Sequence, residues 1–500
     1  MSVDIQSFKQ VNLDRPAELA EALIQLRQEV FDEGRALFDS WCAQMPRRSF
    51  RLSALNFAYY LALRRRDLRA LQDALRPWGV SSLGRLEGRV MPNLDAVIAT
   101  MGQIAGLDAT RLPARPNLRK FYRGERLLNF NTEAVFGKSA QGRRVRIMVT
   151  LPSEAAHNYA LVRDLAQHGM DCARINCAHD DTDAWEAMIA NLRRAEAELG
   201  TQIKVAMDLG GPKSRTASLL IPRNARLRKG DTLLLTREKP VPRKEYRFQA
   251  QCTLVEAFEY LKLGSEVWFD DGKLGTKVES IVPAGVVLRV MQARSEGEKL
   301  KDAKGVNFPG TRLRLDPLTE KDLDDLDFMV EYADIIHYSF VQEAEDIARL
   351  QKELALRTFY PERIAIVAKI ETAAAVENLP SLIVQAGGQQ PFGLMIARGD
   401  LAVEIGFQRM AEMQEEILWL AEAAHVPVIW ATQVLETLAK KGRPTRAEIT
   451  DAAMGERAEC VMLNKGPHVL DAVKILDDVL RRMEAHQNKK SARLRALRSW

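Results

Sequence analysis

Side chains that could act on a phosphate or a carboxylate follow short apolar runs in the second part of the chain. Lys369 and Glu371 close one run, Asp400 follows the next, and Arg174 ends an earlier one. Paired carboxylates suit a hard cation such as Mg²⁺, and fixed lysine and arginine charges stabilise anions that develop during a reaction. These residues therefore predict a site for a phosphorylated or carboxylate-bearing substrate.

Each of these residues also has a structural explanation when it is taken alone. A Lys-x-Glu sequence at a strand end can be an internal ion pair, and an aspartate after glycine often caps a helix. His179 fits a loop histidine as well as a phosphate contact. The convergence of several such residues on neighbouring element ends favours a functional site. The polar residues at these ends are Thr150, Arg174, Asn176, Asp208, Ser339, Lys369, Glu371, Asp400, Thr432 and Asn464.

The elements that must position these residues are β-branched runs that alternate with helical stretches beyond residue 140. Eight such units predict an α/β fold, a (β/α)₈ TIM barrel, whose site lies at the carboxyl ends of the strands. The predicted strands are 145–151, 171–177, 204–209, 334–340, 363–371, 392–398, 426–432 and 459–464.

Two segments do not follow this alternation. Residues 217–303 are strand-like and too long for a loop, which predicts a small β domain inserted after the third barrel strand. Residues 1–135 carry apolar positions at helical spacing and predict an α-helical domain. The expected organisation is a basic helical domain at 1–135, a barrel at 140–216 and 304–488, a β-barrel lid at 217–303, and a tail at 489–500.

The composition excludes several classes of protein. With 46% hydrophobic and 28% charged residues, the chain is globular rather than disordered or fibrous. No apolar run approaches the roughly 18 residues of a membrane helix, and the first residues lack a signal-peptide core, so we expect a cytoplasmic protein without a membrane partner. Five scattered cysteines without CxxC spacing argue against a disulfide framework or a zinc site.

The positive charge is concentrated near the amino terminus. Residues 1–130 carry 20 Lys and Arg against 14 Asp and Glu, and the remainder carries 52 against 53. The run Arg64, Arg65, Arg66, Arg69 and Arg76 is compatible with a nucleic-acid surface, but no recognition motif accompanies it, and a solvated helix face or a domain contact is commoner. We therefore expect no nucleic-acid partner. The wide apolar faces of the helices are compatible with assembly into a homo-oligomer.

A more specific resemblance lies in six segments. They are ARINCAH (173–179), KGVNFPG (304–310), AKIET (368–372), MIARGDLAVEIG (395–406), IWATQVLETL (429–438) and RPTRAE (443–448). In this order they closely resemble the pyruvate kinase family, and the similarity covers roughly 145–480, including the β domain inserted after the third strand.

The resemblance implies transfer of phosphate from phosphoenolpyruvate to ADP or another nucleoside diphosphate, giving pyruvate and ATP. It implies that Glu371 and Asp400 bind Mg²⁺, with Mn²⁺ as an alternative, and that Lys369 stabilises the transferring phosphoryl group and the enolate. Arg174 would contact the substrate phosphate. The carboxylate end would be held by Thr432 and Gly399, and the nucleotide side would be lined by Thr150, Asn176, His179, Arg215 and Lys304.

The chain also departs from the family pattern, mostly on the nucleotide side. TLPS stands in place of TIGP, Gln342 replaces an arginine, and Asn464-Lys465-Gly466-Pro467 stands where the family has SGET. The family's C-terminal effector domain is expected to be absent. These departures leave two alternatives: a Mg²⁺-dependent phosphoenolpyruvate or pyruvate-enolate lyase or aldolase without nucleotide, and a non-catalytic ligand-sensing scaffold. The retention of a charged transition-state site counts against the scaffold.

The monovalent-cation site of the family is altered as well. Asn176 and Asp208 match its oxygen ligands, but Ala178 replaces a serine and Leu209 a threonine. Lys213 stands where the family has a nearby glutamate, and the resemblance implies that its ammonium substitutes for the cation. We therefore expect that K⁺ is not required.

Overall fold

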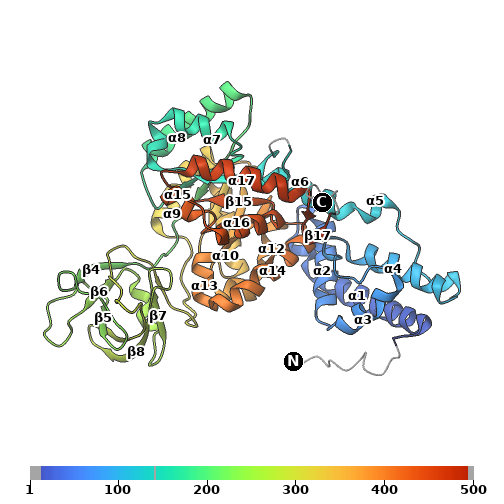
Figure 1. Ribbon diagram of the computed structural model, residues 1–500, viewed down its shortest axis with the longest axis horizontal. Coiled ribbons are helices and arrows are strands. Elements are labelled where there is room, and N and C mark those ends of the chain that lie inside the picture. The colour runs from blue at the N-terminus through green and yellow to red at the C-terminus, as the bar shows by residue number, and fades with distance from the viewer. Residues whose placement is uncertain (1–12, 140–141, 494–500) are drawn as a thin grey trace.

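The computed structural model describes residues 13–139 and 142–493. Its centre is a closed barrel of eight parallel strands in the order β1, β15, β14, β13, β12, β11, β3, β2 (Figure 1), which confirms the predicted (β/α)₈ fold. The strands are β1 (Arg146–Thr150), β2 (Cys172–Asn176), β3 (Lys204–Asp208), β11 (Ile335–Tyr338), β12 (Ala365–Ile370), β13 (Phe392–Ala397), β14 (Val428–Ala431) and β15 (Cys460–Leu463).

The helices around the barrel bury one apolar face against the strands. In α17 (Val469–Glu484) the buried Val469, Val473, Leu476 and Leu480 recur every three or four residues, the period that keeps them on one side. Capping boxes begin α9 and α16. The other helices after the barrel strands are α7 (Tyr159–Gln167), α8 (Thr182–Leu199), α9 (Glu320–Tyr332), α10 (Ala344–Arg357), α11 (Ala373–Glu377), α12 (Leu379–Gly387), α13 (Arg398–Ile405), α14 (Phe407–Ala423), α15 (Glu436–Lys441) and α16 (Arg446–Met454).

The inserted segment forms a seven-stranded sheet with its own apolar core, beside the barrel in Figure 1. The turn between β7 and β8 places Asp270 and Asp271 at positive φ. A Cβ at Gly272 would lie 3.4 Å from Val403 and 3.6 Å from Phe407, so this turn touches the barrel at α13 and α14. The strands are β4 (Thr216–Leu220), β5 (Thr232–Thr236), β6 (Gln249–Cys252), β7 (Glu266–Phe269), β8 (Leu274–Val282), β9 (Gly285–Gln292) and β10 (Val306–Asn307).

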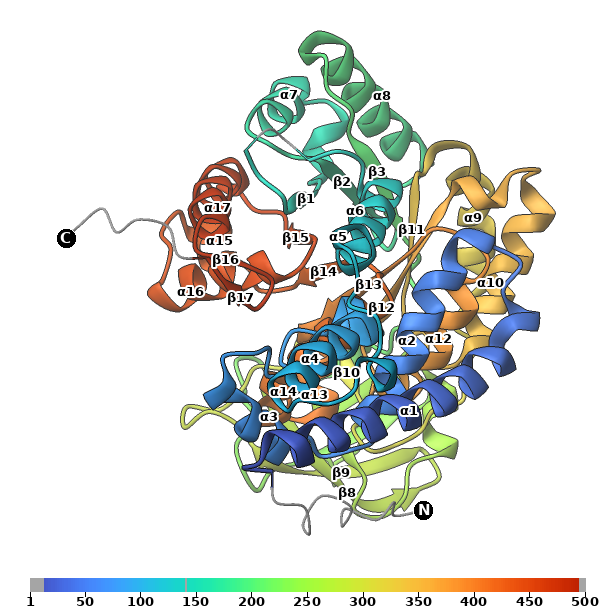
Figure 2. The ribbon, with the colours of Figure 1, turned by 90° about the vertical axis from the view of Figure 1, so that its right-hand side faces the viewer.

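The amino-terminal part of the chain is helical. Its helices are α1 (Pro16–Trp41), α2 (Arg51–Arg64), α3 (Arg69–Leu75), α4 (Val90–Ile104), α5 (Leu118–Phe121) and α6 (Arg123–Phe136). Helix α6 lies over the centre of the ring of strands (Figure 2), and its Val135 and Phe136 join the apolar residues inside the barrel. That end of the barrel is therefore closed, and the carboxyl ends of the strands form the other mouth.

The arginine run of this part makes contacts within the chain. Arg66 pairs with Glu29 and Glu33, and Arg65 also pairs with Glu33. The remaining members contact neighbouring acids or rings: Arg64 with Tyr60 and Trp419, Arg69 with Asp67, and Arg76 with Asp73. These contacts account for the basic run as a set of local ion pairs and packing interactions.

The last described residues form a small hairpin of β16 (Gln487–Asn488) and β17 (Ser491–Ala492). Lys490 pairs with Glu87 of the helical part, and Lys489 pairs with Glu459 of the barrel. The predicted tail at 489–500 thus begins inside a hairpin, and its residues 494–500 lie outside the described residues. None of the described helices has the length and apolarity that a membrane span requires.

His425 joins the barrel to the helical part. Its side chain is 2% exposed, with Nδ1 3.0 Å from the Ser53 hydroxyl and Nε2 2.9 Å from the Gly88 carbonyl. Since a carbonyl only accepts, Nε2 carries the proton and Nδ1 accepts from Ser53. A Cβ at Gly124 of α6 would lie 1.7 Å from the same carbonyl, so the segments are in close contact.

We expect this junction to be sensitive to acid. Burial lowers the pKa of His425 to about 4, below its usual value near 6.5. The unfolded chain therefore binds this proton first, and stability that is complete above about pH 6.5 falls by roughly 3 kcal/mol as the pH drops toward 4. Urea unfolding at pH 7.5 and pH 5 should show a smaller loss for His425→Gln than for the unmodified protein. Equal losses in both would contradict this assignment.

Candidate functional site

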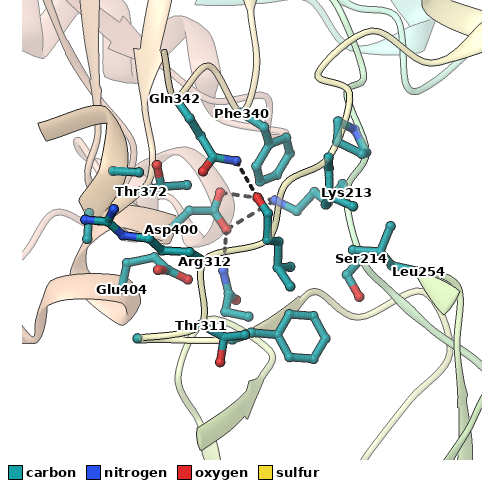
Figure 3. A pocket seen from close by; sticks show the side chains of 18 of the residues that line it. Lys213, Ser214, Leu254, Thr311, Arg312, Phe340, Gln342, Thr372, Asp400 and Glu404 are labelled. Atoms are coloured by element: carbon teal, nitrogen blue, oxygen red, sulfur yellow. Dashed lines mark hydrogen bonds and ion pairs between the residues drawn. The ribbon is translucent and has the colours of Figure 1, made fainter. Parts of the chain in front are cut away.

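A pocket of about 310 Å³ lies between the barrel mouth and the inserted β domain (Figure 3). It opens where the loops after β11, β12 and β13 meet the two segments that connect the barrel with the β domain. Gln342 donates from Nε2 to the Leu313 carbonyl at 3.1 Å. The residues lining the pocket include Lys213, Asn307, Phe340, Gln342, Asp400 and Glu404.

Arg174 and Asp208 form a buried ion pair across the ends of β2 and β3. Arg174 Nε lies 2.8 Å from Asp208 Oδ1, and Nη2 lies 2.5 Å from Oδ2. Nη1 also donates to the Thr150 hydroxyl at 2.9 Å. Burial alone would raise the pKa of Asp208, but the charge of Arg174 holds it well below its usual range. The guanidinium is thus fixed in one orientation, because one edge, Nε and Nη2, is bonded to Asp208 and Nη1 is bonded to Thr150.

Lys369 stands beside this pair with its charge retained. Its Nζ lies 3.0 Å from Glu371 Oε1, 2.7 Å from the Ser339 hydroxyl and 3.6 Å from Asp208 Oδ2. Burial acts to lower the pKa of Lys369, but Glu371 and then Asp208 act against it, and the result is raised. A buried ammonium held between two carboxylates can stabilise negative charge that develops nearby.

Glu371 and Asp400 are the carboxylates that could hold a divalent cation. Glu371 Oε2 accepts from the Phe340 backbone N–H at 2.8 Å, and Asp400 accepts from Lys213 Nζ at 3.2 Å. Among the described residues no three His, Cys, Asp or Glu side chains converge as a metal site. Mg²⁺ is nevertheless commonly held by one or two carboxylates with water and substrate oxygens, and this oxygen donor set fits it.

Thr432 and Gly399 meet beside Asp400. The Gly399 backbone N–H donates to the Thr432 hydroxyl oxygen at 2.9 Å, which leaves the hydroxyl proton available to another acceptor. Thr432 has φ 64° and the following Gln433 has φ 58°. A β-branched residue rarely adopts this left-handed conformation, and such strain persists where the surrounding structure fixes a functional group.

The residues predicted for the nucleotide side come from two places, the ends of β1 and β2 and the base of the β domain. Asn176 Oδ1 accepts from the backbone N–H of Ala178, and Lys304 pairs with Asp270 at 2.9 Å. Burial lowers the pKa of His179, and the nearby charges of Lys465 and Arg215 lower it further. Thr150 joins the Arg174 pair, whereas Arg215 and Lys304 lie at the base of the β domain.

Three features of the site were not predicted. Lys213 reaches Asp400, whereas Asp208 is bonded by Arg174 and by His337, whose Nδ1 lies 2.6 Å from Oδ1. The alternation of residues 334–340 could have indicated His337, because it shares the face of Ser339. Glu404 was missed as well: burial and the charge of Asp400 raise its pKa to about 7.

The closed barrel, the inserted β domain and the charged pocket between them place this protein in the class of (β/α)₈-barrel proteins that carry an inserted β domain at the mouth. The model of the pyruvate kinase barrel domain matches residues 142–467. A pyruvate kinase of Leishmania mexicana is 32% identical over 336 residues, covering 67% of this chain and 65% of the relative. Pyruvate kinase PKLR of Homo sapiens is 32% identical over 379 residues, covering 72% and 62%.

The solved structures agree. A pyruvate kinase from Cryptosporidium parvum superposes with a TM-score of 0.62 at 29% identity, covering 71% of this chain and 73% of that one. The chain belongs to the pyruvate kinase family. It spans slightly less than two thirds of the length of the Leishmania and human relatives.

Proposed function

We propose that this protein transfers phosphate from phosphoenolpyruvate to ADP or another nucleoside diphosphate, forming pyruvate and a nucleoside triphosphate. The observation that carries the proposal is the Lys369 ammonium, buried between Glu371 and Asp208 at the mouth that also holds Asp400. This arrangement suits a reaction in which an enolate and a transferring phosphoryl group carry transient charge.

In this proposal Arg174 binds the phosphate of phosphoenolpyruvate, and Lys369 stabilises the charge that passes from the phosphoryl group to the enolate oxygen. The Thr432 hydroxyl and the backbone at Gly399 hold the substrate carboxylate. Mg²⁺ held by Glu371 and Asp400, or Mn²⁺ in its place, would supply further positive charge to the substrate oxygens. The β domain, whose turn touches α13 and α14, excludes water from the transfer.

The positive rim around His179 favours a nucleotide-dependent reaction over the lyase or aldolase alternative. Lys465 belongs to the altered segment after β15, and its charge lies close enough to His179 to lower the pKa of that imidazole. Arg215 does the same from the β-domain side. Two cations here suit the phosphates of a nucleoside diphosphate, which a lyase would not require. A cytoplasmic location and a homo-oligomeric assembly remain predictions.

The test is a coupled assay with the purified full chain, phosphoenolpyruvate, Mg²⁺ and a panel of nucleoside diphosphates. Pyruvate and triphosphate should form in equal amounts and only when a diphosphate is present. Pyruvate and inorganic phosphate formed at the same rate without nucleotide would mean hydrolysis of phosphoenolpyruvate and would contradict transfer to a nucleotide. Pyruvate released without nucleotide by carbon–carbon cleavage of a 4-hydroxy-2-oxo acid would support the lyase or aldolase alternative instead. If no product forms under either condition, while calorimetry shows phosphoenolpyruvate binding, the protein is a ligand-binding scaffold.

Removal of one proposed metal ligand should shift the Mg²⁺ requirement. In Asp400→Asn, a hard anionic ligand becomes a neutral amide, so the Mg²⁺ concentration for half-maximal rate should rise about tenfold or more. The matched control is Glu377→Gln at the outer rim of the same pocket, where Glu377 pairs with Arg312. A Mg²⁺ titration of Asp400→Asn that overlays that of the control would place the metal elsewhere.

A further inference from the structure

A buried histidine lies beneath the proposed phosphate site. His337 is on β11, where Ile335, His337 and Ser339 alternate toward the inside of the barrel, and its side chain is 0% exposed. Its Nδ1 lies 2.6 Å from Asp208 Oδ1. Its Nε2 has no hydrogen-bond partner within residues 13–139 and 142–493.

The protonation of this imidazole follows from its surroundings. The carboxylate of Asp208 accepts, so Nδ1 must carry the proton of the neutral ring. Burial lowers the pKa of His337, the contact with Asp208 acts against this, and the positive charges of Arg174 and Lys369 lower it further. His337 therefore contributes a neutral donor to a group of two cations and two carboxylates: Arg174, Lys369, Asp208 and Glu371.

The bond to Asp208 also determines the position of Arg174. Asp208 Oδ1 receives two donors, His337 Nδ1 and Arg174 Nε, while Oδ2 receives Arg174 Nη2. If only the guanidinium bonded the Asp208 carboxylate, the two groups could rotate together. The His337 Nδ1–H, which comes from β11, fixes the plane of the carboxylate. The guanidinium fork is then held from two sides, by Asp208 and by the Thr150 hydroxyl.

We propose that His337 is a positioning residue: its Nδ1–H fixes the Asp208 carboxylate and thereby aims Arg174 at the substrate phosphate. The inference rests on the proposed role of Arg174 in binding phosphoenolpyruvate. A histidine that only filled space would be a costly choice, because its Nε2 remains buried without a partner. An aromatic or aliphatic side chain would fill the same interior without that loss.

The test compares two variants at one position. His337→Phe keeps an aromatic ring of similar size and removes the donor, whereas His337→Asn places an amide N–H near the position of Nδ1. We expect His337→Phe to weaken phosphoenolpyruvate binding and raise its KM about tenfold, with a smaller fall in kcat and an unchanged KM for the nucleotide. His337→Asn should restore the KM to within about threefold of the unmodified value.

Two measurements separate this role from packing and from the proposed function. Urea unfolding should show His337→Phe to be at least as stable as the unmodified protein, so that the higher KM cannot be assigned to unfolding. Calorimetric titration of phosphoenolpyruvate without nucleotide needs no turnover. Weaker binding in His337→Phe, rescued in His337→Asn, supports the inference even if the unmodified protein forms no pyruvate. Equal binding in all three proteins, or equal loss in both variants, overturns it.

Discussion

Replacing Lys369 with methionine is expected to lower kcat by about 10²-fold or more, while phosphoenolpyruvate binding changes only a few-fold. The ammonium lies 3.0 Å from Glu371 and 2.7 Å from the Ser339 hydroxyl. These contacts at the end of a strand hold the ammonium in one position. Its charge is matched by carboxylates before the reaction begins. Its largest contribution therefore comes when additional negative charge develops on the phosphoryl and enolate oxygens.

Methionine is the informative replacement, because it keeps an unbranched side chain of similar length and removes the ammonium with its charge and its N–H donors. Single-turnover and steady-state rates should fall together, and calorimetry should still detect phosphoenolpyruvate. Lys440→Met serves as the control, since Lys440 is an exposed lysine paired with Glu436 on α15, away from the pocket. Turnover of Lys369→Met within a few-fold of that control would remove Lys369 from the proposed chemistry.

The barrel could be predicted from the sequence because its strands are buried on both faces. The run 392–398 contains almost only apolar residues, and β13 occupies Phe392–Ala397 with every residue buried. The polar residues that close such runs meet at one mouth by the geometry of the fold, so Arg174, Lys369 and Thr432 could be identified before any coordinates were known.

The contacts between those side chains could not be predicted in the same way. A histidine within a strand pattern does not show which carboxylate lies opposite, and the Asp208 partner of His337 comes from a strand 129 residues earlier. His425 is a similar case, because its partners Ser53 and Gly88 belong to the helical part. Such pairings depend on the docking of separate segments, which periodicity along one segment does not encode.

The ammonium of Lys213 pairs with Asp400, and this contact bears on the expected independence from potassium. The family resemblance placed its ammonium near Asn176 and Asp208, whereas its Nζ lies 3.2 Å from Asp400. Burial acts to raise the pKa of Asp400, but Lys213 and then Lys369 hold it lowered. A positive charge is thus attached to the chain beside a proposed metal ligand, and no binding equilibrium is needed to supply it.

Reversing this charge should produce the second large effect. In Lys213→Glu a third carboxylate would lie near Asp400 and Asp271. The pKa of Asp271 is already raised by burial and by the charge of Asp400. We expect kcat/KM for phosphoenolpyruvate to fall about 10²-fold, and Lys213→Met, which removes the charge without reversing it, to lose about tenfold. Potassium should restore Lys213→Glu only poorly, since Ala178 offers no side-chain oxygen to a cation.

The same assay tests whether the unmodified protein requires a monovalent cation. Rates should be equal in potassium, sodium and tetramethylammonium buffers of one ionic strength, because a tethered ammonium is present at every salt composition. If Lys213 instead pointed only to solvent, Lys213→Met would keep the full rate. A several-fold stimulation of the unmodified protein by potassium would contradict the proposal directly, because it would show that the ammonium beside Asp400 leaves a cation site unfilled.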